Sequence, residues 1–170
     1  MMDVHPPLRE GKLPLRLWLQ LMKCAKGIEA DVSGRFRRSF DQSLARFDVL
    51  SQLYRLSDHR GSIGEIADTV MAASGNITAL IDRMVDEGLV ERRANPNDRR
   101  SSQVTMTPRG QALFRDMTAA HADWMRDALA DLSEDEMVAL VDLLRKTRQS
   151  VDRSMEKRRR HALVQTGSAA

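Results

Sequence analysis

Between Ser62 and Met106 the sequence places two short helical patterns directly before two strand-like runs. Ser62 and Glu65 have the spacing of a capping box, in which the hydroxyl accepts from the Glu65 amide and the carboxylate accepts from the Ser62 amide. The apolar residues of this stretch recur at helical spacing on one face: Ile63, Ile66, Ala67, Val70 and Met71. We therefore predict a helix that begins next to Ser62.

A second helix is predicted from Ser74 to Gly88. Serine is a favourable N-cap, and glycine is a favourable stop because it readily adopts the left-handed conformation that ends a helix. Only Ala72 and Ala73 separate this helix from the first. Two helices with apolar faces and so short a connection must cross at a steep angle, as in a helix-turn-helix. The apolar face of the second helix comprises Ile77, Leu80, Ile81, Met84 and Val85.

The outward face of the second helix carries short side chains near its start. Short side chains allow a helix to enter the major groove of DNA, where Asn and Arg can make paired hydrogen bonds with base edges. A polar face that simply contacts solvent explains the same residue types, so the helix alone leaves both interpretations open. The residues of this face are Ser74, Asn76, Thr78 and Ala79, with Arg83 one turn later.

Two strand-like runs, Leu89–Ala94 and Ser102–Met106, flank a polar tip over residues 95–101 and predict a β-hairpin. An arginine at such a tip can enter a narrow minor groove, and Asp98 can hold its guanidinium in place. A hairpin after a helix-turn-helix predicts a winged helix-turn-helix that binds duplex DNA. Positive charge beside the second helix comes from Arg92, Arg93, Arg99 and Arg100.

Five runs of this region resemble motifs of the MarR family of bacterial transcriptional regulators: residues 74–78, 80–84, 87–90, 96–100 and 105–107. The resemblance covers most of the chain, and its specific motifs lie between Arg46 and Phe114. It implies a mainly α-helical fold with a small β-hairpin wing, in which a winged helix-turn-helix head stands on a helical dimerisation layer. The family pattern also implies repression, although activation needs the same contacts at a differently placed DNA site.

Carried over residue by residue, the resemblance implies two groups of DNA contacts. Ser74, Asn76, Thr78 and Arg83 form the major-groove group. Asp98 and Arg100 form the pair at the tip of the wing, and Arg99 makes a second phosphate or minor-groove contact.

The chain is expected to comprise three parts. Residues 1–45 form an N-terminal arm and a dimerisation helix, residues 46–106 the DNA-binding head, and residues 107–170 the C-terminal dimerisation helices and a tail. Apolar residues occupy several faces of the stretch Leu13–Val32. Further helices are predicted to start at Thr107–Pro108 and at a second capping box formed by Ser133 and Glu136.

These terminal helices carry more apolar surface than the head alone could cover. We therefore expect a two-fold homodimer whose terminal helices interlock, which also places two recognition helices for successive major grooves.

The composition excludes several other classes of protein and site. The formal net charge is only +3 although 30% of the residues are charged, so binding to DNA depends on where the cations lie. One cysteine excludes an intrachain disulfide, and no Cys/His cluster has the spacing of a zinc site, so no metal or cofactor is predicted. The apolar run Leu13–Met22 contains Arg16 and is too short to span a membrane. A cytoplasmic protein without membrane contact is expected.

The resemblance also implies a small anionic and often aromatic effector, bound where the dimer helices meet the head. Residues 15–47, with His121 and Trp124, resemble a branch of the family that controls aromatic-acid catabolism and in part responds to coenzyme A thioesters. Arg35, Arg37 and Arg38 suit a carboxylate or a phosphate, although a solvated basic helix end or a contact with DNA phosphate explains them equally well. Each aromatic or apolar candidate could instead be core. The predicted ligand residues are Trp18, Met22, Arg35, Arg38, Phe47, His121 and Trp124.

The sequence supports redox sensing and metal sensing less well than an aromatic effector. Cys24 could sense oxidants, but no polar partner is evident, and a buried, inert thiol is the favoured interpretation. The four histidines, His5, His59, His121 and His161, are scattered. The run from Lys157 to Arg160 is expected to be a solvated helix end that could add unspecific DNA affinity.

An enzyme is disfavoured because the sequence has no glycine-rich phosphate loop and its carboxylates are distributed as helix-surface charges. A winged helix that binds a protein instead of DNA is the stronger alternative, because the fold alone does not decide function.

Overall fold

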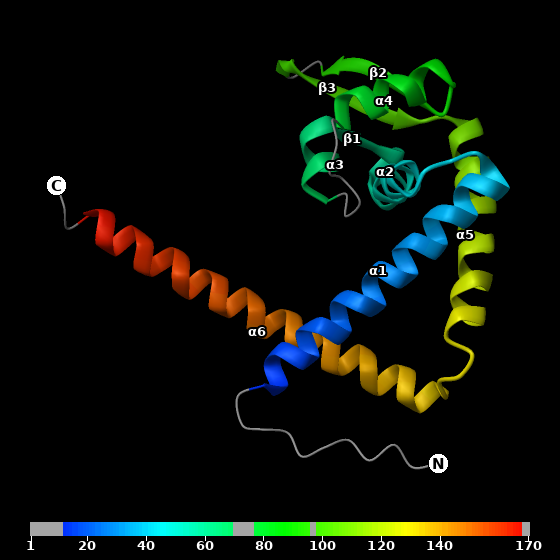
Figure 1. Ribbon diagram of the computed structural model, residues 1–170. Coiled ribbons are helices and arrows are strands. Elements are labelled where there is room, and N and C mark those ends of the chain that lie inside the picture. Colours follow the sequence, from blue (N-terminus) through cyan, green and yellow to red (C-terminus); the bar gives the residue numbers. More distant parts are fainter. Residues whose placement is uncertain (1–11, 70–76, 96–97, 168–170) are drawn as a thin grey trace. The chain divides into compact units, whose positions relative to one another are not determined.

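The computed structural model describes residues 12–69, 77–95 and 98–167, and the side chains of 12–68, 77–94 and 102–161. It divides into two compact units, Met1–Met125 and Arg126–Ala170, which are described separately. The elements are mainly helices with one small sheet, as predicted (Figure 1). In chain order they are α1 (Leu13–Phe40), α2 (Leu44–Arg55), η1 (Ser57–His59), β1 (Arg60–Ser62), α3 (Ile63–Thr69), α4 (Ile77–Asp86), β2 (Val90–Asn95), β3 (Asp98–Met106), α5 (Pro108–Ala128) and α6 (Glu134–Gly167).

The capping box at the start of α3 has the predicted geometry. The Ser62 amide donates to Glu65 Oε2 at 2.8 Å, and the Glu65 amide donates to Ser62 Oγ at 3.2 Å. Hydrogen bonds from Ser62 stabilise the carboxylate and hold the pKa of Glu65 below its ordinary value. The proposed connection between the two helices and the N-cap Ser74 lie outside the described residues.

The end of α4 also has the predicted geometry. Gly88 has a φ of 68°. Its amide donates to the Val85 carbonyl, and the Leu89 amide donates to the Met84 carbonyl, both at 2.9 Å. These two bonds satisfy carbonyls that the helix leaves unpaired and turn the chain directly into β2.

The three strands form one antiparallel sheet in the order β1-β3-β2. The predicted hairpin is present, with Val90 opposite Met106 and Arg92 opposite Val104. Two details differ from the prediction. β3 begins at Asp98 and not at Ser102, because backbone pairing continues past Ala94 through an irregularity at Asn95. The short strand β1 was not predicted, since its three residues, Arg60–Ser62, carry no apolar alternation.

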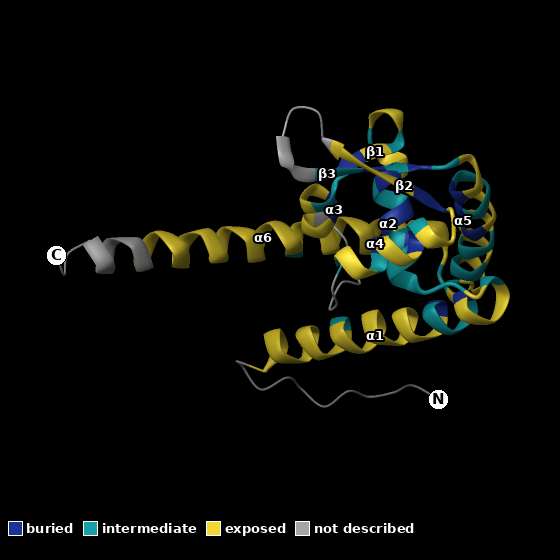
Figure 2. Cartoon of the chain, turned by 90° about the horizontal axis from the view of Figure 1, so that it is seen from above, coloured by how far each residue is buried: buried dark blue, intermediate teal, exposed yellow. Residues whose placement is uncertain are grey.

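The core of the first unit joins the head to the end of α1 and to α5. Figure 2 shows the buried residues gathered on α2, the sheet and the facing sides of α4 and α5. Gly110 is buried at the start of α5, where a Cβ would lie 2.1 Å from the Leu89 carbonyl oxygen. Only glycine therefore allows α5 to approach β2 so closely. Among the described residues, the largest fully buried side chains are Phe36, Val49, Leu50, Leu53, Ile66, Ile81, Met84, Val90, Val104 and Met117.

The helix starts at Thr107–Pro108 and at Ser133 are confirmed. Thr107 Oγ1 accepts from the Gly110 amide at 3.0 Å, and Ser133 Oγ accepts from the Glu136 amide at 3.3 Å. α5 then continues to Ala128.

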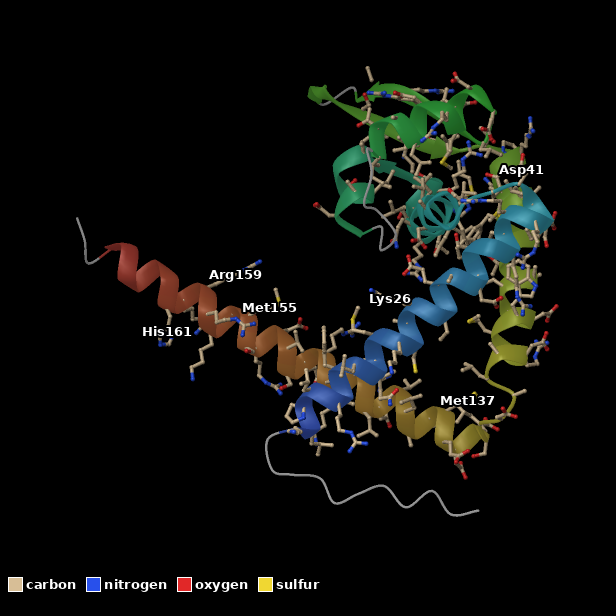
Figure 3. All side chains as sticks on the ribbon, in the orientation of Figure 1. Lys26, Asp41, Met137, Met155, Arg159 and His161 are labelled. Atoms are coloured by element: carbon tan, nitrogen blue, oxygen red, sulfur yellow. The ribbon has the colours of Figure 1, made fainter. Side chains whose placement is uncertain are left out.

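α1 continues past the predicted apolar stretch to Phe40 and ends where Asp41 takes a left-handed conformation with φ 53° (Figure 3). This extension brings the last two turns of α1, which contain Phe36, against the head.

Much of the apolar surface of α1 and α6 is exposed in the single chain. None of the helices in the described ranges is both long enough and apolar enough to cross a bilayer. Among the residues whose side chains are described, the large apolar residues exposed on α1 are Leu13, Leu15, Leu17, Trp18, Leu19, Met22 and Ile28, and those exposed on α6 are Val138, Leu140, Val141, Leu143, Leu144, Val151 and Met155.

Candidate nucleic-acid interface and small-molecule site

The outward face of α4 is open to solvent in this chain. Thr78, Ala79 and Arg83 are exposed, whereas Ile81 and Met84 on the opposite face are buried. The Arg83 Nε donates to the Ala79 carbonyl at 3.2 Å, so the base of this side chain is held along the helix. Thr78 and Arg83 are thus both accessible on α4. The other two residues predicted for the major groove, Ser74 and Asn76, lie outside the described residues.

The wing is tied to α4 by an ion pair that the sequence analysis missed. Arg92 on β2 donates to Asp82 on α4 at 2.7 Å. Arg93 points outward with an 80% exposed side chain and pairs with Glu91 on the same strand at 2.8 Å. Arg92 therefore fixes the wing against α4, and Arg93 is the more accessible cation.

The tip of the wing belongs to the sheet. Asp98, Arg99 and Arg100 are the first residues of β3, and the structure describes their backbone but not their side chains. Their predicted contacts with DNA therefore stay predictions. Their place in the strand does fix where along the wing they stand, opposite the end of β2.

A second long-range ion pair holds the base of α4. Arg46, near the start of α2, donates through both terminal nitrogens to the Glu87 carboxylate, with one contact at 2.8 Å, and Nη1 also donates to Gln42 at 2.8 Å. The Arg46 side chain is only 14% exposed. Two parallel bonds fix both groups in one plane, so α2 and the end of α4 are held together.

This pair lies in a cleft of about 470 Å³ that also contains Arg83. No local spacing could have signalled Arg46, because its partner is 41 residues away. The cleft is lined by Arg37, Asp41, Gln42, Ser43, Arg46, Leu80, Arg83 and Glu87.

Three of the predicted ligand residues meet in one aromatic cluster. Phe47 and His121 lie edge-to-face with centroids 5.3 Å apart, and Phe36 lies 4.8 Å from Phe47 and 5.2 Å from Trp124. Phe47 is buried, and His121 and Trp124 are half-buried. The rings join α1, α2 and α5. This cluster is the point where the head meets the long helices of the first unit.

A cavity of about 320 Å³ borders this cluster. Of the predicted ligand residues, its lining includes His121. Burial lowers the pKa of His121 below its ordinary value, and the nearby Asp48 carboxylate partly opposes that shift. The walls are mostly apolar, with carboxylates at two positions; they comprise Ala25, Ile28, Glu29, Val32, Leu44, Asp48 and His121.

The other predicted ligand residues lie along α1. Arg35 pairs with Asp31 at 2.9 Å, and its guanidinium stands 5.8 Å from the centre of the Trp124 ring, so it borders the aromatic cluster. Arg38 is exposed one turn later. Trp18 and Met22 are exposed toward the N-terminal end of α1. Trp18 lies about 27 Å along the helix axis from Phe36, so one chain does not bring it into the cluster.

Cys24 is exposed on α1, and the expectation of a buried thiol is therefore wrong for this chain. The other residues of this part of α1, 13–20 and 22–31, are exposed as well. No group of three His, Cys, Asp or Glu side chains that could hold a metal occurs within the described part of the chain.

Comparison with known proteins finds similarity to transcriptional regulators. A sequence model of the MarR family matches residues 43–102. Among curated proteins, the transcriptional regulator MhqR of Bacillus subtilis is 28% identical over 132 residues, which cover 78% of this chain and 89% of MhqR. The transcriptional repressor YetL of the same organism is 26% identical over 130 residues, which cover 76% of this chain and 77% of YetL.

Solved structures share the fold. The MarR family regulator Sco3205 of Streptomyces coelicolor, crystallised in complex with DNA, superposes with a TM-score of 0.72 at 19% identity. The superposition covers 87% of this chain and 92% of Sco3205. A likeness at this identity shows that the elements share one arrangement.

Proposed function

We propose that the chain is a member of the MarR family of winged-helix transcriptional regulators and acts as a dimeric repressor that a small aromatic molecule releases from a pseudo-palindromic operator. The match of residues 43–102 to the MarR sequence model and the similarity to MhqR support the family. It is a regulator and not an enzyme. The division into an N-terminal dimerisation part (1–45), a DNA-binding head (46–106) and a C-terminal dimerisation part (107–170) belongs to this proposal.

The observation that carries the proposal is the exposed outer face of α4 beside a wing that is fixed to it. Thr78 and Arg83 stand on that face, and the pair between Arg92 and Asp82 sets the position of the wing. With α4 in the major groove, the residues at the start of β3 reach the flanking minor groove. The proposed DNA contacts are Ser74, Asn76, Thr78, Arg83, Asp98, Arg99 and Arg100.

Dimerisation is supported by the apolar surface of α1 and α6. Leu143 is 61% and Trp18 is 55% exposed in the single chain. Burial of a Leu side chain contributes about 2 kcal/mol to the free energy of association. Many such residues on two helices therefore favour association with a second copy of the chain. Two heads in one dimer read two half-sites, which is why a pseudo-palindromic operator is proposed.

The effector is proposed to bind at the aromatic cluster and the cavity beside it. A ligand between α1, α2 and α5 would change the spacing of the head relative to α1, and DNA affinity depends on that spacing. A cavity of about 320 Å³ fits a small aromatic molecule. Arg35 and Arg38 would attract the carboxylate of an aromatic acid or the phosphates of its coenzyme A thioester.

The test is a fluorescence anisotropy titration of the protein against the intergenic DNA upstream of its own gene, at fixed salt, with unrelated duplex as the control. Aromatic acids, their coenzyme A thioesters, and matched neutral and cationic aromatic compounds are then added. Tight binding to the upstream DNA that one ligand class reverses supports the proposal. Binding no tighter than to unrelated DNA contradicts it.

The Arg100→Ala variant distinguishes a winged helix that binds DNA from one that binds a protein instead. If the wing contacts DNA, this variant loses at least about tenfold in affinity for the upstream DNA and keeps its oligomeric state. Unchanged DNA binding by the variant supports a role in protein interaction.

A further inference from the structure

The second half of α6 contains a segment with a high net positive charge. Residues 152–161 contain five cations, Arg153, Lys157, Arg158, Arg159 and Arg160, and two carboxylates, Asp152 and Glu156, which leave a formal charge of +3, equal to that of all 170 residues. The first half of the helix, residues 134–151, is slightly acidic, with four carboxylates and three cations. We name residues 152–161 the basic segment.

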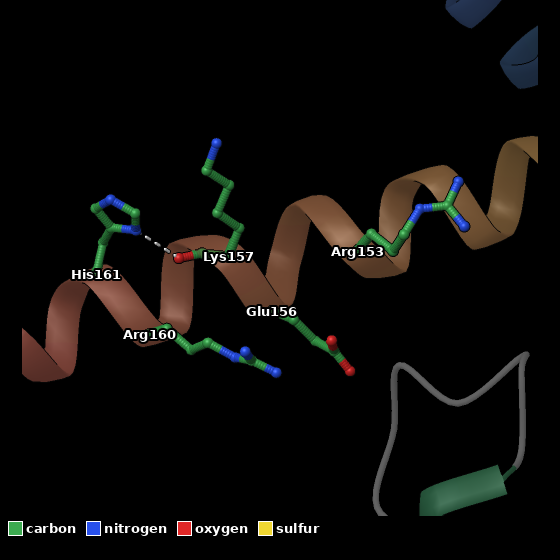
Figure 4. A pocket seen from close by; sticks show the side chains of 5 residues that line it. All are labelled: Arg153, Glu156, Lys157, Arg160 and His161. Atoms are coloured by element: carbon green, nitrogen blue, oxygen red, sulfur yellow. Dashed lines mark hydrogen bonds between the residues drawn. The ribbon is translucent and has the colours of Figure 1, made fainter.

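The cations of the basic segment surround the helix. Four of them are consecutive, and each residue turns an α-helix by about 100°, so positive charge faces every direction. All the side chains of the segment are exposed. Figure 4 shows Lys157 and His161 on one side and Arg160 on the other, around a shallow pocket of about 230 Å³. A long anionic partner thus meets at least two cations from any side.

Packing and capping do not account for these cations. Met155 is the one apolar residue of the basic segment. The other large apolar side chains that are exposed on the described part of α6 lie between Val138 and Val151. The last turn of α6, near Gly167, contains no basic residue, so the cations are too far from the C-terminus to interact with the helix dipole. Arg153 and Lys157, four residues apart, repel each other within the helix.

We propose that the basic segment binds the phosphate backbone of duplex DNA without sequence preference, outside the contacts of α4 and the wing. From Arg153 to Arg160 the helix rises about 10 Å, over which a duplex presents about six phosphate charges. Bound phosphates relieve the repulsion between the cations. This inference rests on the proposed function, because it adds a DNA contact to a DNA-binding protein.

The test measures how DNA affinity depends on salt. The full chain, an Arg158→Gln/Arg159→Gln/Arg160→Gln variant and a control variant, Arg115→Gln/Lys146→Gln/Arg148→Gln, are titrated against an unrelated 40-base-pair duplex at several salt concentrations. Both variants lose three exposed cations, so the control corrects for net charge. We expect the slope of log K against log salt to become less steep by about 0.9 for each lost phosphate contact in the first variant only.

Equal slopes for the two variants overturn the inference. If the upstream DNA still binds and responds to Arg100→Ala, the proposed function stands while this inference fails; if the unaltered chain binds no DNA, both fail. Binding to phosphatidylserine vesicles is measured for the same proteins. If the first variant loses vesicle binding as strongly as it loses DNA binding, the segment is assigned to a lipid surface, and the proposal is contradicted. Far-UV circular dichroism and sedimentation establish that both variants keep their fold and oligomeric state.

Discussion

At Gly88 the backbone takes a φ of 68°, which allows α4 to end and β2 to begin within three residues. A Cβ there would meet nothing within 4 Å, so substitution changes conformation and not packing. We expect Gly88→Ala to lower the free energy of unfolding by about 1–2 kcal/mol, because L-residues disfavour the left-handed region. Urea unfolding followed by circular dichroism measures the change.

The matched control is Gly27→Ala. Gly27 lies inside α1, and a Cβ there also meets nothing within 4 Å. Alanine is favoured over glycine in a helix by about 1 kcal/mol, so this variant should be as stable as the unaltered chain or more stable. The same loss of stability in both variants would contradict the role given to Gly88.

His121 links stability to pH. Burial lowers its pKa below the ordinary 6.5 in the folded chain, with Asp48 opposing that shift, so the unfolded chain binds the proton more tightly. The stability due to this residue is complete above pH 6.5 and is lost as the pH falls toward the folded pKa. We expect unfolding free energy to decrease between pH 7.5 and pH 5, and His121→Gln to flatten that decrease. An equally steep profile in the variant contradicts this assignment.

Residue types at helix ends were predictable, and long-range partners were not. Ser62, Gly88 and Ser133 have the predicted capping roles because each depends on residues three or four positions away. Arg46 and Asp82 were missed because their partners follow 41 and 10 residues later in the chain. Cys24 was expected to be buried because the sequence offers it no evident polar partner, but α1 leaves it exposed.

At the scale of elements, the pair between Arg46 and Glu87 joins α2 to the turn after α4. Arg46 is largely buried and donates to Glu87 with two nitrogens. In a double-mutant cycle of Arg46→Ala and Glu87→Ala, we expect a stabilising coupling of about 1 kcal/mol in urea unfolding. The exposed pair of Arg93 and Glu91 is the control, with an expected coupling below about 0.5 kcal/mol. Similar couplings in the two cycles would contradict the special role of Arg46.

Most elements were predictable because they are long and periodic, and the exceptions have physical causes. β1 depends on pairing with a strand more than 40 residues later, with Arg60 opposite Thr105. The start of β3 was placed too late because Asp98 and its neighbours pair through the backbone, which leaves no trace in side-chain polarity. α1 extends beyond the apolar stretch Leu13–Val32, because Phe36 packs its last turns against the head.

The aromatic cluster was predicted only in part. Phe47, His121 and Trp124 were predicted because aromatic side chains commonly line sites for flat ligands. The cavity beside them is lined by small, aliphatic and acidic residues from three helices, such as Ala25, Leu44 and Asp48. Their proximity follows from helix crossing, which sequence spacing does not encode.

At the scale of the whole molecule, the surface of α6 is the strongest argument for a second copy. Val141, Leu144, Val151 and Met155 recur at intervals of three, four or seven residues, and each is between 41% and 52% exposed. Such a stripe forms one side of a helix that packs against other helices. An exposed stripe of this length is unfavourable in water, and pairing of two chains through a two-fold axis would cover both copies at once.

Charges introduced into that stripe test the dimer. We expect Val141→Glu/Leu144→Glu to raise the dimer dissociation constant at least about 100-fold, because each carboxylate would be buried in an apolar interface without a partner. Gln149→Glu/Ser150→Glu adds the same two charges at exposed polar positions of α6 and should leave the dimer intact.

Sedimentation equilibrium between 0.1 and 100 µM, a range chosen for about three decades of affinity, distinguishes monomer from dimer. Because an operator with two half-sites needs both heads, the first variant should also lose affinity for the upstream DNA, whereas its far-UV circular dichroism should still show folded helices. A dimer that survives the first pair of charges would mean that the stripe on α6 is covered by something other than a second copy.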